Sequence, residues 1–454
     1  MADGRKAKAI PKIECGNQED VKRLVRDLHV SFIQFWFVDV LGFLKSFAVT
    51  PSELSEGLTE GMGFDGSSIE GFARIQESDM IAKPDPQTFQ LLPWRDAERP
   101  VARMFCDILN PDGTPYDGDS RFVFKRLLGK VAEKGYSFYV GPELEYFYFK
   151  DNRDTEPLDS GGYFDTRPLD VGSDLRRDTI FALQSMGIQV EYSHHEVAPS
   201  QHEIDLRYDE GLKMADKTVT YRLVIKEIAR QHGVYATFMP KPIFGQNGSG
   251  MHVHQSLFEG ARNAFHDGSD KYNLSPIAKH YIAGLLRHAP EIAAITNQWV
   301  NSYKRLVPGY EAPVYVSWAR RNRSAMIRVP MYKPGKEAAT RMEFRSPDPA
   351  CNPYLAFAVM LGAGMDGIEK KMDLPDPIEE DIYEMNPAER KAHGIRDLPG
   401  NLYAAILEAE KSKLVKEVLG RHIFSKFIEN KKIEWDTYRI HVSRYELDRY
   451  LPRL

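Results

Sequence analysis

The sequence has few cysteines, no long apolar run and no block of one charge. Its three cysteines, Cys15, Cys106 and Cys351, are far apart and lack CxxC spacing, so neither a disulfide framework nor a thiolate metal site is indicated. The most apolar stretch, residues 353–367, is too short to span a bilayer and contains Asp366. The amino terminus carries charge but no apolar signal segment. We therefore expect a cytoplasmic protein in a reducing compartment, not bound to membranes.

The composition also excludes several classes of protein. The 454 residues have a net charge of −5, and no continuous Lys/Arg block is long enough to bind nucleic acid, so we expect no nucleic-acid partner. A hydrophobic share of 42% and a charged share of 28% are ordinary for a globular protein, which excludes a disordered or fibrous chain. This length predicts roughly two to four domains.

Strand-like runs dominate the first part of the chain. Two aromatic-rich runs within residues 30–50, separated near Leu41 and Gly42, predict a β-hairpin in a small amino-terminal β domain. Residues 110–119 are dense in turn formers and are the best candidate linker. We place the domain boundary near residue 115, which gives domains 1–115 and 116–454.

The second domain mixes strands with amphipathic helices. Strand-like runs such as SFYVGPELEYFYF, ATFMPKPIF, MHVHQSLF and RMEFRSP alternate irregularly with helical patterns. One helix is predicted over residues 210–231, and another begins at Ser275-Pro276, where Ser is a typical N-cap and Pro a typical first helical residue. The pattern after Leu402 is again helical. Strands outnumber crossover helices, so the predicted fold class is α+β.

Several acidic and imidazole side chains have spacings that suit hard metal ions. Glu143 and Glu145 are two apart in a β-prone run and therefore share one strand face. Carboxylates crowded on one face repel each other unless a cation lies between them. Taken alone, this run could equally be an exposed polar face.

The other candidate ligands follow in later motifs. In HHEVAPSQHE a hairpin would bring Glu196 and Glu203 to one edge, although such turns are often plain surface turns. In NGSGMHVHQS, His252 and His254 share a strand face behind a glycine-rich turn, although buried core histidines are commoner than ligands. With Glu343, the set has more carboxylates than nitrogens, which favours Mg²⁺ or Mn²⁺ over Zn²⁺. Two such sites predict an enzyme that handles the phosphates of a nucleotide.

An arginine cluster supports this prediction. Guanidinium groups stay charged and bind carboxylates and phosphates bidentately. A surface salt-bridge face would look similar, but the segments NSYKRLVPGYEAP and RRNRSAMIR are loop-like, which favours a binding role in phosphoryl transfer. The cluster comprises Arg305, Arg320, Arg321, Arg323, Arg328, Arg341 and Arg345.

Together with MGFDGSSIEGF, GPELEYF, KPIFGQNGSGMHVHQS and RMEFRSPDPACNPY, these motifs give the chain a close resemblance to type I glutamine synthetases. The motifs run in the family's order from about residue 30 to the carboxyl terminus. The resemblance implies an amino-terminal β-grasp domain, a catalytic domain with a curved antiparallel sheet flanked by helices, and ATP-dependent synthesis of glutamine from glutamate and ammonia.

The resemblance also implies roles for residues. The first metal site would use Glu145, Glu196 and Glu203, and the second Glu143, His252 and Glu343. The glutamate site would contain Asn247, Gly248, Arg305, Glu311, Arg323 and Arg345. ATP would contact Glu191, His254, Gln255, Ser256, Arg323, Arg328 and Lys336, although the spacing from Lys336 to Arg341 departs from the family pattern.

The resemblance further implies which residues bind and deprotonate ammonium and how the subunits assemble. Asp65 resembles the base that deprotonates ammonium, Ser68 would shape the same pocket, and Glu311 would close over the intermediate. Arg328 and Arg345 would neutralise the transferred phosphoryl group. In the family Asp65 and Ser68 come from a neighbouring subunit, so we expect a dodecamer of two hexameric rings. Nitrogen-regulatory proteins are further partners that the resemblance implies.

The subtype and two rival functions are the remaining questions. The short connection from Phe149 to Gly161 resembles the α-type, in which Arg74 would mediate feedback inhibition by glutamine. Tyr383 is at the position that the longer type adenylylates, but its surroundings differ, so we expect no modification. A ligase for larger γ-glutamyl amines is disfavoured by the intact DGSS and GYEAP motifs. A non-catalytic scaffold is disfavoured by the complete ligand set.

Overall fold

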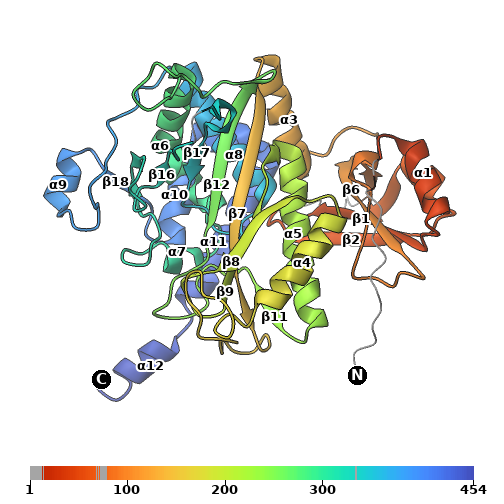
Figure 1. The fold of residues 1–454 in the computed structure, drawn as a ribbon, viewed down its shortest axis with the longest axis horizontal. Coiled ribbons are helices and arrows are strands. Elements are labelled where there is room, and N and C mark those ends of the chain that lie inside the picture. Colours follow the sequence, from red (N-terminus) through yellow and green to blue (C-terminus); the bar gives the residue numbers. More distant parts are fainter. Residues whose placement is uncertain (1–12, 14, 68, 70, 72–78, 333–334) are drawn as a thin grey trace.

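The computed structural model describes residues 13, 15–67, 69, 71, 79–332 and 335–454. These residues form a smaller amino-terminal unit and a larger carboxyl-terminal unit, each with its own sheet (Figure 1). Helices accompany both sheets, which confirms the predicted α+β class.

The amino-terminal unit is a six-stranded sheet with two helices. The predicted hairpin is confirmed, because β1 and β2 pair antiparallel, with Ile33 opposite Val49. β1 also pairs in parallel with β6, so the strand order is β2-β1-β6-β4-β3, with β5 beside β6. Phe35, Phe89 and Met104 are fully buried in the core of this unit. Its elements are α1 (Gln18–Asp27), β1 (Phe32–Val38), β2 (Leu44–Val49), α2 (Leu54–Thr59), β3 (Met62–Asp65), β4 (Asp79–Pro84), β5 (Gln90–Leu91) and β6 (Val101–Leu109).

The carboxyl-terminal sheet is long and mostly antiparallel. Its order is β15-β16-β17-β12-β7-β9-β8, with β10 and β11 beside β7 and β13 beside β12, and only the β15–β16 pair of these strands is parallel. The strands are β7 (Ser137–Phe149), β8 (Val190–His195), β9 (Gln201–Leu206), β10 (Asp209–Glu210), β11 (Tyr235–Thr237), β12 (Met251–Glu259), β13 (Arg262–Asn263), β15 (Trp318–Ala319), β16 (Ile327–Arg328) and β17 (Met342–Phe344). A separate pair joins β14 (Tyr315–Val316) and β18 (Arg396–Asp397).

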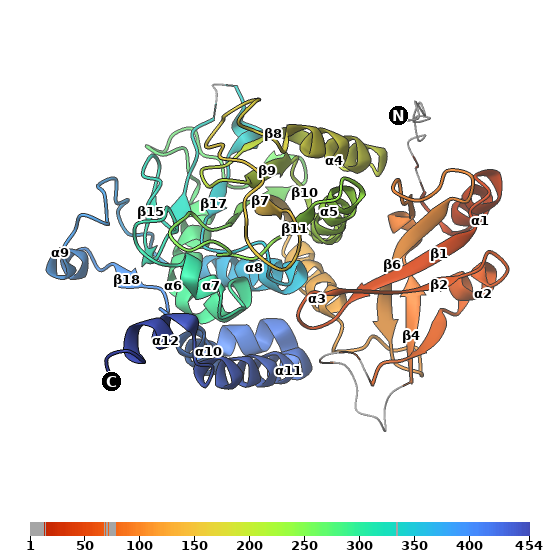
Figure 2. The ribbon, with the colours of Figure 1, turned by 90° about the horizontal axis from the view of Figure 1, so that it is seen from below.

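Helices cover one side of this sheet in two layers (Figure 2). α6 and α8 lie next to the strands, and α10 and α11 lie beyond them. α8 is packed on several sides, so residues 354–361 are all fully buried and its sequence is apolar all round. The helices are α3 (Ser120–Glu133), α4 (Ser173–Ser185), α5 (Gly211–Gln231), α6 (Pro276–Thr296), α7 (Ser302–Arg305), α8 (Pro353–Glu369), α9 (Pro387–Ala392), α10 (Leu402–Lys411), α11 (Lys413–Arg439) and α12 (Arg444–Tyr450).

Most predicted helices and strands are confirmed, and one strand is much shorter than predicted. α5 covers the helix predicted over residues 210–231, and the Ser275 hydroxyl accepts from the Ala278 amide at the start of α6. The run ATFMPKPIF contributes only the end of β11. Pro240 and Pro242 have no amide hydrogen and cannot continue a ladder, so the chain leaves the sheet there.

The turn between β1 and β2 packs against the carboxyl-terminal unit. The Gln298 side chain donates to the Leu41 carbonyl at 2.8 Å, and the Asn352 side chain donates to the Val40 carbonyl at 3.1 Å. At Gly42, where φ is 82°, a Cβ atom would lie 2.7 Å from the Asn352 Cα, so only glycine permits this close approach. The turn therefore holds the amino-terminal sheet against the start of α8.

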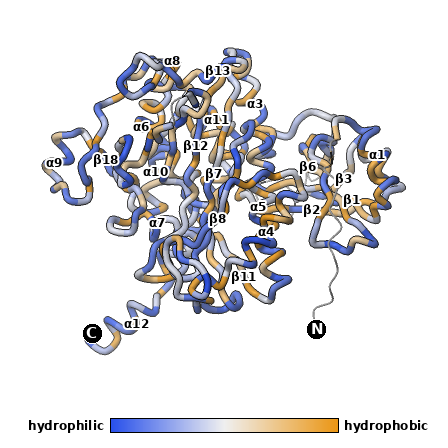
Figure 3. The backbone as a smooth tube through the Cα atoms, in the orientation of Figure 1, coloured by the Kyte–Doolittle hydropathy of each residue, from blue (hydrophilic) through white to orange (hydrophobic). Residues whose placement is uncertain are grey.

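Hydropathy follows this architecture. In Figure 3 hydrophobic residues are frequent along the interior elements, whereas the segment around α9 is mainly hydrophilic. None of the helices in the described residues is long and apolar enough to cross a membrane.

Candidate active site

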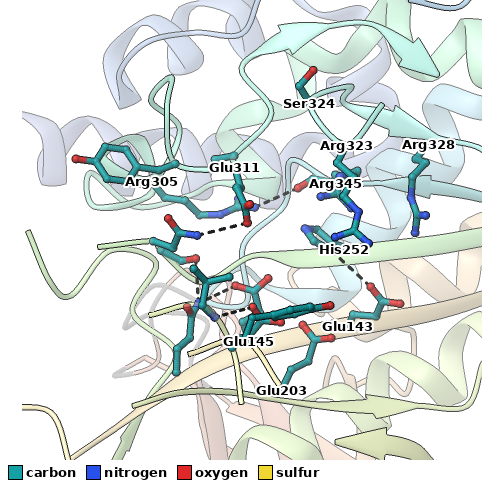
Figure 4. Close-up of a pocket in the computed structure, with 18 of the residues that line it drawn as sticks. Glu143, Glu145, Glu203, His252, Arg305, Glu311, Arg323, Ser324, Arg328 and Arg345 are labelled. Carbon is teal, nitrogen blue, oxygen red and sulfur yellow. Dashed lines mark hydrogen bonds and ion pairs between the residues drawn. The ribbon is translucent and has the colours of Figure 1, made fainter. Parts of the chain in front are cut away.

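One face of the carboxyl-terminal sheet carries most of the predicted metal ligands. Glu143 and Glu145 are on β7, with His252 of β12 opposite Glu143 and Glu203 of β9 opposite Glu145. Because residues opposite each other in a ladder project to the same face, these four side chains converge. Glu343 of β17 joins the same face opposite His254. Figure 4 shows the convergence around one pocket.

The predicted second site is a compact cluster. His252 Nδ1 lies 3.5 Å from a Glu143 carboxylate oxygen and 3.6 Å from a Glu343 oxygen, and one ligand atom from each residue lies within 4.8 Å of the others. Glu343 is fully buried and accepts from Arg328 Nε and Arg345 Nη1, each at 2.5 Å. Burial opposes its ionisation, but Arg345 and the nearby cations outweigh this and lower the pKa of Glu343 to about 2. Glu343 is therefore ionised at neutral pH.

In the predicted first metal site, the structure groups Glu196 and Glu203 with His194, which was not predicted, in place of Glu145. Glu196 and Glu203 form a cluster of ligand atoms with His194, whose Nε2 donates to Glu196 Oε1 at 2.8 Å. Glu145 lines the same cavity, but its Oε2 accepts from the Gly250 amide and the Gln201 side chain, both at 2.9 Å. His194 was not among the predicted ligands, although the doubled histidine before Glu196 was a signal for it.

The raised pKa values of the carboxyl groups in the first site indicate that these side chains together suit a divalent cation. Burial and, to a smaller extent, Glu196 raise the pKa of Glu145 to about 8. Burial together with Asp205 and Glu145 raises the pKa of Glu203 well above its usual range. Buried acids with no cation between them hold protons, and a metal ion replaces those protons. The oxygen-rich set suits Mg²⁺ or Mn²⁺.

The raised pKa of Glu145 predicts that the stability of the metal-free protein depends on pH. In the unfolded chain this carboxyl titrates near 4.5, whereas in the fold it keeps its proton up to about pH 8. Between these two pH values the folded state binds more protons than the unfolded state, so the free energy of unfolding of the metal-free protein should fall as the pH rises from about 4.5 to about 8 and level off above that. Thermal unfolding in EDTA would measure this, and Mn²⁺ should reverse the loss. Glu145→Gln should flatten the dependence, and an equally steep fall in that variant would contradict this assignment.

The large cavity, about 720 Å³, collects the residues predicted to bind glutamate. Arg305, almost fully buried, donates to the carbonyls of Ser346, Arg345 and Pro347, which fixes its guanidinium beside the cavity. The Asn247 amide donates to Glu311 Oε2 at 3.4 Å, so the Glu311 loop contacts the glycine-rich turn. The predicted residues that line it are Asn247, Gly248, Arg305, Glu311, Arg323, Arg328 and Arg345.

A smaller cavity of about 260 Å³ adjoins the large one and shares Glu143 and Tyr192 with it. Four residues predicted to contact ATP line it, namely Glu191, His254, Gln255 and Ser256. Arg341 also lines it and donates from Nε to His254 Nδ1 at 3.1 Å, a contact that the sequence analysis did not assign. Lys336 is exposed and lines neither cavity.

The remaining predicted residues lie elsewhere. Asp65, at the end of β3, is exposed and lines neither cavity, and its carboxylate accepts from the Ser67 amide. Ser68 and Arg74 lie outside the described residues. Arg320 and Arg321 donate their amides to Glu379 and do not line either cavity. Tyr383 lines the large cavity, and its hydroxyl donates to the Ala312 carbonyl at 2.6 Å.

Comparison with known proteins identifies the family of this chain. The family model described as the catalytic domain of glutamine synthetase matches residues 117–450, and that of the beta-grasp domain matches residues 29–111. A glutamine synthetase of Mycolicibacterium smegmatis is 53% identical over 440 residues, covering 96% of this chain and 99% of the relative.

Two solved structures have the same fold over nearly the whole chain. A glutamine synthetase of Plasmodium falciparum, determined by cryo-electron microscopy, superposes with a TM-score of 0.88 at 26% identity and covers 96% of this chain and 99% of its own. A structure titled as a GmaS/ADP complex superposes with a TM-score of 0.86 at 29% identity and covers 95% and 99%. The matched domains and the extent of identity show that the chain belongs to the glutamine synthetase family.

Proposed function

We propose that the protein ligates ammonia to L-glutamate in an ATP-dependent reaction through γ-glutamyl phosphate, which yields L-glutamine, ADP and phosphate and assimilates nitrogen. The observation that carries this proposal is the pair of carboxylate clusters that face buried arginines across one cavity. That arrangement suits a substrate carboxylate that receives a phosphoryl group.

Two divalent cations, Mg²⁺ or Mn²⁺, complete the proposed site. Glu145, Glu196 and Glu203 would hold the first, and Glu143, His252 and Glu343 the second. The crowded acids of the first set and the ionised carboxylate of Glu343 in the second support this assignment. When bound, the cations would neutralise phosphoryl oxygens during transfer.

The chain's own residues would bind and orient the reactants. Ammonia does not attack a carboxylate at a useful rate, so glutamate must first become an acyl phosphate. ATP would lie in the small cavity, and Arg328 and Arg345 would stabilise the charge of the transferred group, since both already contact Glu343 beside the large cavity. ATP-site roles for Arg323 and Lys336 remain proposals from family resemblance.

Ammonium must lose a proton before it can attack, because its nitrogen has no free lone pair. Asp65 would be the base, and Ser68 would shape the anionic pocket. Glu311 would close over the intermediate, keep water from the acyl phosphate and accept a proton as the adduct collapses.

The proposed assembly is a dodecamer of two hexameric rings. Asp65 and Ser68 would come from a neighbouring subunit, which the position of Asp65 away from its own chain's cavities supports. We further propose a cytoplasmic location, nitrogen-regulatory proteins as partners, and a division into domains 1–115 and 116–454.

The substrate class is tested by phosphate release with ATP and glutamate while the amine is varied. Ammonium should support turnover, whereas ethylamine and putrescine should support at least about tenfold less, because the anionic pocket is small and a larger amine would leave buried groups unpaired. Turnover with only the larger amines would overturn the proposal in favour of a γ-glutamyl-amine ligase.

Regulation is proposed to follow the α-type. Arg74 would mediate inhibition by glutamine, so Arg74→Ala should raise the glutamine concentration needed for half-inhibition several-fold while the uninhibited rate stays unchanged. An inhibition curve identical to that of the unmodified enzyme would refute this role. Tyr383 would remain unmodified, which its hydrogen bond to Ala312 supports.

A further inference from the structure

Behind the first metal cluster lies a second group of ligand-type side chains, Asp159, His195 and His202. All three side chains are almost fully buried. Their ligand atoms lie within 4.8 Å of one another, as a metal site requires. Asp159 belongs to the connection between β7 and α4, and the two histidines belong to β8 and β9.

The hydrogen bonds show that this group does not present free ligand atoms. His195 Nδ1 faces the Glu196 carbonyl at 2.7 Å, and His195 Nε2 faces Asp159 Oδ1 at 3.1 Å, so both nitrogens act as donors. His202 Nδ1 is 2.7 Å from Arg176 Nη1, which can only donate. The proton of a neutral His202 is therefore on Nε2, which leaves no lone pair there for a metal.

The same contacts connect Asp159 to the Glu196 turn. Besides His195, Asp159 Oδ1 accepts from the Ser200 amide at 2.8 Å, and Asp159 Oδ2 accepts from the Val171 amide at 3.1 Å. Ser200 adopts a positive φ of 59°, and its hydroxyl accepts from the Leu158 amide at 2.6 Å. The turn from Glu196 to Ser200 is thus held at both ends by one connection.

Tight packing keeps this connection in place. A Cβ atom on Gly161 would lie 2.7 Å from His195 Nε2, so a larger residue would push the ring away from Asp159. The Phe164 amide also donates to the His195 carbonyl at 3.1 Å. The short segment after β7 is therefore a support for the hairpin that carries Glu196 and Glu203.

We propose that Asp159 is a positioning residue for the first metal site and acts through His195 on the main chain of Glu196. Groups that orient metal ligands through hydrogen bonds typically change metal affinity about 10- to 100-fold when they are lost. This inference rests on the first metal site of the proposed function. It adds a pair, Asp159 and His195, that determines how tightly that site holds its cation.

The test is a Mn²⁺ titration of the full-length assembled protein, followed by electron paramagnetic resonance. Asp159→Asn keeps the side-chain shape but turns an amide NH₂ toward donors. It should weaken one class of Mn²⁺ sites about tenfold or more and leave the class formed with Glu343 unchanged. Asp165→Asn is the matched control, because Asp165 is exposed in the same connection and, among the described residues, its side chain accepts from the Gly162 amide alone.

A pair of substitutions at His195 separates the contribution of its contact with Glu196 from that of its contact with Asp159. An Asn amide can occupy the position of Nδ1 and still donate to the Glu196 carbonyl, whereas a Gln amide reaches the position of Nε2 and donates to Asp159 only. We expect His195→Gln to weaken Mn²⁺ binding more than His195→Asn.

The possible outcomes are distinct. Asp159→Asn with wild-type Mn²⁺ affinity, or with both classes weakened equally and a lower melting temperature, would overturn the inference. A wild-type protein without two classes of Mn²⁺ sites would instead contradict the proposed function. Because the readout is metal binding, neither result depends on glutamine formation.

Discussion

Glu343→Gln should lower the rate of glutamine formation roughly 10³-fold, as expected when a charged group at a phosphoryl-transfer site is lost. The Glu343 carboxylate is fully buried and accepts from both Arg328 and Arg345. A Gln amide would remove the anion, face these guanidinium groups with an NH₂ donor and deprive the second cation of a ligand. The substitution therefore damages the metal site and the two arginines together.

The measurement is glutamine formed per unit time at saturating ATP, glutamate, ammonium and Mn²⁺. Glu379→Gln is the matched control, because Glu379 also accepts hydrogen bonds beside arginines but is exposed and lines neither cavity. The control should keep wild-type activity. A Glu343→Gln enzyme with more than about a tenth of the wild-type rate would show that this carboxylate is not essential.

Asp65→Asn should be nearly inactive as well, and its activity should return when it is assembled with Glu343→Gln subunits. If each site combines the cavity of one subunit with Asp65 of its neighbour, an intact site needs one subunit of each kind in a fixed order. Random assembly of equal amounts would place both intact parts at about one quarter of the sites. Recovery of about a quarter of the wild-type activity is therefore expected.

Complementation requires proof that subunits exchange. The two variants would be denatured and refolded together, and purification through a tag on each would isolate mixed assemblies. Mixed assemblies as inactive as either parent would contradict a shared site. Asp65→Asn that keeps ammonium-dependent turnover would remove Asp65 from the mechanism altogether.

The local parts of the site could be predicted from the sequence, because they depend on short-range periodicity. Spacing by two placed Glu143 and Glu145 on one face of β7, and the hairpin that carries Glu196 and Glu203 is present as β8 and β9. The pairing of His252 opposite Glu143 joins strands about a hundred residues apart, and no local pattern reports such a pairing.

Residues that act through contacts were the ones missed. His194 was given no role, although it belongs to a doubled histidine and contacts Glu196 two residues further along the chain. Arg341 was named only as a member of the arginine cluster, because its contact with His254 joins residues 87 positions apart and appears only in the fold. Asp159 was overlooked for the same reason, since it lies in a connection of irregular structure. Motifs identify the residues that touch substrates more readily than those that hold them in place.

The order of strands in the large sheet has a consequence for synthesis on the ribosome. Its ligand-bearing strands are spread from β7 to β17, so Glu143 meets Glu343 only after some two hundred further residues have emerged. A nascent chain that ends before β17 lacks a partner along that edge of β12. Capture of the second cation should therefore occur late, after most of the polypeptide has been translated, and ribosome-bound fragments ending near residue 330 should lack the Mn²⁺ site that Glu343 completes.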